Sequence, residues 1–160
     1  MKFIIKLIIS SALIFSLSAF AKSAPYGPVI TYAQAKVVLA AAEAEAVKNN
    51  WPVVIVVVDS GGNPVLLHRM DNAHLGSLEI AEGKARTAVN LRRPTKNLQE
   101  AIAKGGAALR LLGVEGIMPL EGGIPIIVDG KIIGGIGVSG VNSAQDAQAG
   151  QAGIDALLKK

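Results

Sequence analysis

Two histidines, His68 and His74, are the side chains of this sequence best suited to acid–base or ligand chemistry. An imidazole titrates close to neutral pH, and its neutral form is a common metal ligand. Their six-residue spacing does not align the two rings on one face of a helix, so they form no local metal motif. Each ring could equally be an ordinary histidine at the surface or at a sheet edge.

The glycine-rich segment Gly135–Gly140 contains Ser139, a second candidate for chemistry. This serine lacks the Gly-x-Ser-x-Gly context of a hydrolase nucleophile. The segment also matches the dinucleotide pattern Gly-x-Gly-x-x-Gly, but the strand before it is reached through a tight hairpin and not through a parallel crossover. The catalytic residues are therefore unknown, and the sequence leaves open whether the protein is an enzyme.

Positive charge gathers in the region that follows the first histidine. Charge-assisted hydrogen bonds from such a group can recognise carboxylates. The same side chains could instead form a solvated helix face with local salt bridges, for which Glu82 is a suitable partner. The cations of this region are Arg69, Lys84, Arg86, Arg92 and Arg93.

A hairpin near the C-terminal end organises the predicted fold. Two β-branched runs, 124–128 and 131–138, flank Asp129-Gly130, a pair typical of a type I′ turn because both residues tolerate positive φ. Glycines inside a strand indicate a close approach of backbone or ligand. Either a helix or a ligand is therefore expected against Gly134, Gly135, Gly137 and Gly140.

The remaining elements follow from periodicity and from cap patterns. The sequence predicts an α/β (α+β) fold in the order α-β-β-α-α-β-β-β-α, with a central, mainly antiparallel sheet of about five strands and helices packed on it. The predicted helices cover 31–49, 73–90, 95–113 and a last segment opened by a Ser143–Asp146 capping box. The predicted strands cover 53–58, 65–70, a short stretch near Met118 and the two strands of the hairpin.

The first twenty-one residues are typical of a cleaved signal peptide. Lys2 and Lys6 precede an apolar stretch that ends at Ala19-Phe20-Ala21, a small-x-small cleavage pattern. We expect an arm over 22–29, a single domain over 30–160, a periplasmic or secreted location, and no membrane association after cleavage. Because the chain has no Cys, disulfides, thiolate metal sites and a lipid-bearing Cys are all excluded.

The charge does not favour nucleic acid as a partner. The formal net charge is +4, and removal of Lys2 and Lys6 lowers it to +2. Aromatic residues make up 4% of the chain, too few for a base-stacking surface.

Several short motif pieces follow one another in a characteristic order. In chain order they are Arg69-Met70-Asp71, Lys84–Ala88, Pro94-Thr95, Gly122–Ile126 and Gly137–Gly140 followed by Asp146. Together these pieces resemble the GlcG/HbpS haem-binding family, whose members are also described as haem-degrading, and the resemblance covers roughly residues 30–158. It implies a compact α/β fold with a central antiparallel sheet, homo-oligomers, and haem bound non-covalently in some members.

These observations lead to the hypothesis of an exported haem- or tetrapyrrole-binding protein. His74 or His68 would lie near the iron, because imidazole is a common axial ligand of haem. Arg69, Lys84, Arg86 and Thr87 would bind the rest of the cofactor, with the cations near the propionates. Sensing, scavenging and degradation of haem are all compatible with this hypothesis. Side chains of second rank as iron ligands are Met70, Met118, Tyr26 and Tyr32.

Two alternatives stay open. The first is an enzyme or sensor domain for a small organic acid, which would use Arg69, Lys84 and Thr87 without any metal. The second is a structural, oligomeric module that binds a protein partner and no small molecule.

Overall fold

The computed structural model describes residues 23–159 of the chain, and the predicted signal peptide over 1–21 lies outside them. Within that part, no helix is both long and apolar enough to cross a membrane. The elements, in chain order, are α1 (Tyr32–Lys48), β1 (Val54–Asp59), β2 (Pro64–Arg69), α2 (Ser77–Asn90), α3 (Thr95–Ala103), the 3₁₀ helix η1 (Gly106–Gly113), β3 (Gly123–Val128), β4 (Lys131–Ser139) and α4 (Ser143–Leu158).

The strands form one antiparallel sheet in the order β2-β1-β4-β3. The mixed α/β class and the antiparallel pairing are thus confirmed, but the sheet has four strands and not the five that we expected. The strand predicted near Met118 is wrong for a local reason. The Met118 N–H donates to the Thr87 hydroxyl at 2.8 Å, so a side chain of α2 satisfies this backbone group instead of a neighbouring strand.

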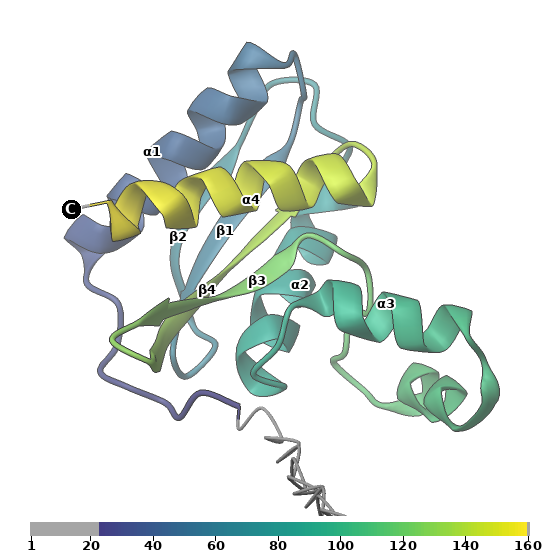
Figure 1. Ribbon diagram of the computed structural model, residues 1–160. Coiled ribbons are helices and arrows are strands. Elements are labelled where there is room, and N and C mark those ends of the chain that lie inside the picture. Colours follow the sequence, from purple (N-terminus) through teal and green to yellow (C-terminus); the bar gives the residue numbers. More distant parts are fainter. Residues whose placement is uncertain (1–22, 160) are drawn as a thin grey trace, which may run out of the picture.

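The sheet is covered on both faces, which explains the unbroken apolar run of β1. Helices α1 and α4 pack together on one face, and α2 covers the other (Figure 1). Along β1, Ile55 and Val57 belong to the cluster under α1 and α4, whereas Val54, Val56 and Val58 belong to the cluster under α2. Because successive strand side chains point to opposite faces, a strand buried on both sides must be apolar at every position.

The hairpin between β3 and β4 turns as predicted. Asp129 has φ 49° and Gly130 has φ 70°, so both central residues adopt the positive values that a type I′ turn requires. Pro125 lies in β3, an edge strand, where a missing amide donor is tolerated.

The glycines of this hairpin are explained by a helix and by neighbouring strands, not by a ligand. A Cβ atom at Gly137 would overlap the carbonyl oxygen of Ala81, and one at Gly123 would overlap that of Lys84. Both of these oxygens belong to α2. Gly135 lies under the same helix, because its Cβ would be 2.7 Å from a methyl carbon of Val89. Helix α2 therefore rests on the backbone of β3 and β4.

Two helix boundaries differ from the prediction. Helix α2 begins at Ser77 and not at Ala73, because the chain first turns, with the Ala73 N–H donating to Met70 O and the Ser77 N–H to His74 O. The helix expected over 95–113 is two elements. Gly105 and Gly106 have φ of 75° and 63°, values that interrupt a right-handed helix between α3 and η1.

The helix caps also differ in part. The capping box of Thr31 and Gln34 on α1 is confirmed. On α4 the box is formed by Asn142 and Gln145, so the predicted Ser143–Asp146 box is wrong by one residue. This shift frees the Asp146 carboxylate for another contact.

The segment that precedes α1 lies along the start of β4. The Gly27 N–H donates to Ile132 O at 2.8 Å, and the Ile132 N–H donates to Pro25 O at 2.8 Å. The Tyr26 hydroxyl donates to Val89 O of α2 at 3.0 Å. This segment therefore extends the hydrogen bonding of the sheet beyond the end of β1.

We predict that Gly137→Ala lowers the free energy of unfolding by about 3 kcal/mol, because the added methyl group forces α2 away from β4. Gly150 in α4 is a matched control, since its Cβ would meet no atom closer than 3.5 Å. Gly150→Ala should raise stability by about 0.5–1 kcal/mol through helix propensity. Urea denaturation measures both, and equal effects of the two changes would contradict this packing.

The turn between β1 and β2 gives a prediction on pH. Burial raises the pKa of the Asp59 carboxyl, but hydrogen bonds from the amides of Asn63 and Gly61, at 2.9 and 2.8 Å, outweigh burial and hold the pKa below its usual 3.8. A lowered carboxyl pKa contributes stability that is present above pH 3.8 and is lost as the pH falls through the folded-state pKa.

Asp59→Ala should therefore lower the free energy of unfolding by about 1 kcal/mol at neutral pH, and the difference from the wild type should shrink in acid. Asp59→Asn keeps an acceptor oxygen, so its loss at neutral pH should be smaller than that of Asp59→Ala, and it should shrink in acid as well because only the wild type titrates at this position. Urea denaturation in a pH series tests this. A loss for Asp59→Ala that stays constant down to pH values below 3.8 would disprove the role of the carboxylate.

Candidate functional site

The candidate site is built around Lys84, a lysine that is 2% exposed. Its Nζ donates to Asp146 Oδ2 at 2.8 Å and to Val138 O at 2.8 Å. Lys84 comes from the middle of α2, Asp146 from the first turn of α4, and Val138 from the end of β4. The pair thus joins helices that lie on opposite faces of the sheet.

A glycine lets the pair form. Gly122 precedes β3 and has φ 124°, a backbone conformation that side chains rarely adopt. A Cβ atom there would be 2.8 Å from Lys84 Nζ and 3.0 Å from Asp146 Cβ. The absent side chain therefore leaves the space in which lysine and aspartate meet.

Burial opposes the charged form of each partner. It lowers the pKa of Lys84 from its usual 10.5 and raises the pKa of Asp146 from its usual 3.8, and the hydrogen bond between the two groups counteracts both shifts. Asp146 Oδ1 also accepts from the Val141 N–H at 3.2 Å. Each group therefore depends on its partner, because an unpaired charge in this place would be very costly.

A cavity of about 190 Å³ lies beside this ion pair. It is lined by residues from the loop before α2, from α2 itself, from the segment before β3, from the end of β4 and from the start of α4. The polar or charged residues among those that line it include His74, Ser77, Lys84, Ser139 and Asp146.

The structure places the two histidines apart. His74 is exposed, lies in the loop between β2 and α2, and lines the cavity. His68 pairs with Ile55 across the sheet and faces α1, where its Nε2 is 3.4 Å from Glu43 Oε1. Within residues 23–159, no three His, Asp or Glu side chains gather closely enough to hold a metal ion. Either imidazole could therefore serve only as a single ligand to an iron that a cofactor already holds.

The other predicted binding residues do not converge on one point. Arg69 ends β2 and is exposed, and it forms no ion pair within the described residues. Arg86 pairs with Glu82 at 2.6 Å and donates to Gly62 O at 3.2 Å. Thr87 is buried and holds the Met118 backbone. Of this predicted set, only Lys84 shares the cavity with His74.

The side chains of second rank as iron ligands have structural contacts. Met70 packs against the core beside α1, and the Tyr26 hydroxyl bonds to α2. The ring of Tyr32 is 4.8 Å from Lys36 Nζ. Met118 lies close to Gly83 of α2, since a Cβ atom on that glycine would be 3.0 Å from Met118 Cβ.

Asp146, Ser77 and Ser139 belong to the site, and our sequence reasoning assigned them no role in it. A signal for Asp146 was present, because it shares the buried stripe of α4 with Gly150 and Ile154. A carboxylate on an otherwise apolar stripe requires a buried partner. The sequence did not indicate which cation that partner would be.

We predict that Lys84→Ala and Asp146→Ala each lower the free energy of unfolding by about 3–5 kcal/mol, because each leaves the other charge buried and unpaired. The double change Lys84→Met with Asp146→Leu should cost less than the sum of the two single losses. Lys96→Ala, which breaks an exposed pair with Glu121, should leave the urea unfolding curve almost unchanged. Similar curves for Asp146→Ala and Lys96→Ala would contradict the buried pair.

A family model described as haem degrading protein HbpS-like matches residues 30–155. Protein GlcG of Escherichia coli K12 is 42% identical over 111 residues, which span 69% of this chain and 81% of GlcG.

Two solved structures show the same fold. A double mutant of HbpS from Streptomyces reticuli is 33% identical with a TM-score of 0.74, and the match covers 81% of this chain and 87% of that one. A PduOC:haem complex is 32% identical with a TM-score of 0.74, with coverage of 80% and 94%. The chain therefore belongs to the HbpS-like family, in agreement with the resemblance of its motif pieces.

Proposed function

We propose that this protein is an exported haem-binding protein that holds haem non-covalently, with the His74 imidazole as a ligand of the iron. The observation that carries this proposal is the place of His74, an exposed imidazole at the rim of the cavity beside the Lys84–Asp146 pair. Membership of the HbpS-like family and the PduOC:haem complex of a relative support it.

The surroundings of His74 suit a flat apolar ring. Leu75, the next residue, is 79% exposed, and Leu120, which lines the same cavity, is 40% exposed. Exposed leucines beside an imidazole offer both an apolar surface and an iron ligand, which are the two things that a porphyrin needs. His68 does not line this cavity and lies beside the carboxylate of Glu43.

The size of the cavity limits how haem can bind. Pockets for drug-sized ligands have volumes of roughly 300–1,000 Å³, so a cavity of about 190 Å³ is too small to enclose a porphyrin. The ring would lie across the rim, with one face against the protein. A second copy of the chain would cover the other face, and we therefore include a homo-oligomer in the proposal.

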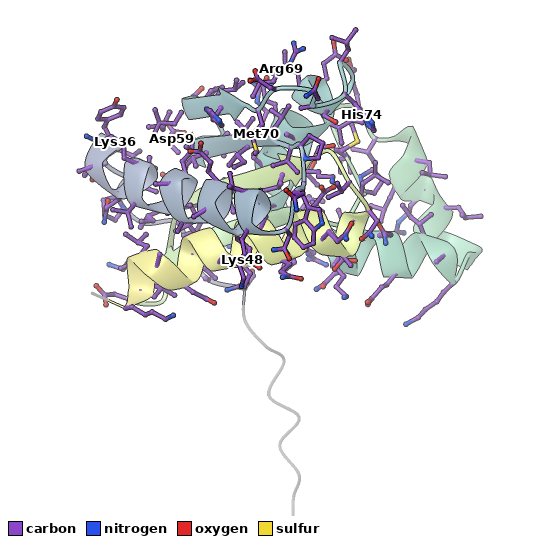
Figure 2. The ribbon with its side chains drawn as sticks, turned by 90° about the horizontal axis from the view of Figure 1, so that it is seen from above. Lys36, Lys48, Asp59, Arg69, Met70 and His74 are labelled. Carbon is purple, nitrogen blue, oxygen red and sulfur yellow. The ribbon has the colours of Figure 1, made fainter. Side chains whose placement is uncertain are left out.

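Arg69 is the best placed cation for a propionate among those that we predicted. It is exposed and lies five residues before His74, whereas Lys84 and Arg86 already pair with Asp146 and Glu82. Figure 2 labels both residues, Arg69 at the last position of β2 and His74 in the loop that leads to α2. Bound haem would supply a redox-active iron, and sensing, scavenging and degradation are different uses of it. Export follows from the signal-peptide pattern of residues 1–21.

Haemin titration of the protein from residue 22 onwards, followed by absorbance, tests the proposal. We expect a saturable Soret shift at no more than one haem per subunit. His74→Ala should weaken binding by roughly tenfold or more and change the Soret position, because the iron loses its ligand. His68→Ala is the matched control and should behave as the wild type.

Other outcomes have distinct meanings. A Soret shift that is the same in His74→Ala would mean that another group binds the iron, such as a tyrosine, a methionine or a side chain at an interface. The absence of any saturable shift with the wild type would disprove haem binding and would favour the organic-acid alternative.

A further inference from the structure

Two serine hydroxyls open into the cavity beside the ion pair without a protein partner. Ser77 is 3% exposed and Ser139 is 5% exposed, and both line the cavity. Every fully enclosed side-chain oxygen or nitrogen within residues 23–159 has a hydrogen-bond partner, but neither of these hydroxyls takes part in a bond there. Their oxygens are therefore not fully enclosed, and because both residues line the cavity, a ligand or water in it could satisfy them.

The ion pair adds a donor to the wall of the cavity. Asp146 accepts from Lys84 Nζ through Oδ2 and from the Val141 N–H through Oδ1. The ammonium group of Lys84 has three donors, and the bonds to Asp146 and Val138 use two of them. One N–H of Lys84 and two hydroxyls thus have no partner within residues 23–159, whereas each oxygen of the Asp146 carboxylate already accepts one hydrogen bond.

Two helices also begin at this cavity. Ser77 is the first residue of α2, which has no side-chain cap, and Ser143 is the first residue of α4. The N-terminal end of a helix carries a partial positive charge and favours an anion. The N-terminus of α4 is already capped by Asn142 and carries Asp146 in its first turn, so the uncapped N-terminus of α2 contributes more of this charge to the wall.

We infer that this cavity binds a carboxylate group, which accepts hydrogen bonds from the Ser77 and Ser139 hydroxyls and from the remaining N–H of Lys84. A volume of about 190 Å³ suits a carboxylate on a short carbon chain. Two sources present this group: a free monocarboxylic acid of a few carbons, and a propionate of a haem that lies on the rim. The inference stands apart from the haem proposal, because either source fills the same subsite.

Amide shifts in a proton–nitrogen correlation spectrum test this subsite during titration with acetate and with propanoate. The amides of Ser77, Gly140, Val141 and Ser143 should shift and saturate. Acetamide, which has the shape of acetate without its charge, should leave them unshifted. Ser77→Ala and Ser139→Ala should each weaken acetate binding by roughly tenfold, and the rest of the spectrum reports that they still fold.

Ser60→Ala is the matched control, because the Ser60 hydroxyl donates to Gly27 O at 3.4 Å and does not line the cavity. It should bind acetate as the wild type does. Equal shifts with acetate and acetamide, no shifts at these four amides, or unchanged acetate binding in both serine variants would each overturn the inference, whatever the haemin titration gives.

Haemin and its dimethyl ester then distinguish the two sources. If the ester binds at least roughly tenfold more weakly than haemin and acetate competes with haemin, a propionate occupies the subsite. If esterification has no effect while acetate still shifts the four amides, the subsite serves a free acid. Acetate binding without any haemin binding would refute the haem proposal and leave the carboxylate subsite in place.

Discussion

The buried contact between Lys84 and Asp146 is the constraint on which the architecture depends. The two residues lie on helices that cover opposite faces of the sheet, and they meet at the end of β4 where Gly122 leaves a passage. The hydrogen bond from Lys84 to Val138 O fixes the strand to the same point. The ammonium group of Lys84 therefore fixes α2, the sheet and α4 relative to one another. Because burying two charges is costly, the pair contributes more to this arrangement than to net stability.

Most of the fold follows from local rules, and the exceptions have physical causes. In the β-branched run of β1 and in the Asp129-Gly130 turn, the local conformational preference of the residues agrees with the structure that they form. The missing strand near Met118 depends on where a backbone group finds its partner, and a sequence pattern does not contain that information. The break at Gly105 and Gly106 comes from the positive φ of two adjacent glycines, a pair that is visible in the sequence. A threonine hydroxyl on α2 replaced a strand in the first case.

The site was less predictable than the fold, because it is formed by long-range contacts. His74 and Lys84 were identified by their chemical types, but Asp146 was assigned to a cap and the two serines were given no binding role. The motif pieces that carry the family resemblance hold the scaffold together: Lys84, Gly122 and Asp146 meet one another, and Thr95 bonds to Leu120 O at 2.6 Å. They identify the fold without naming a ligand, which is why the ligand had to be argued from His74 and the cavity.

The pairing of β1 with β4 has a consequence for how the chain folds. Ile55 lies opposite Val138, so the central pair of the sheet joins segments from the two ends of the domain. Neither the sheet nor the contact of residues 25–27 with Ile132 can form until β4 has been synthesised. Such long-range closure slows folding, because the entropy of closing a large loop is lost before the contacts are gained. In the export that we propose, this late closure would keep the polypeptide in a translocatable state during synthesis.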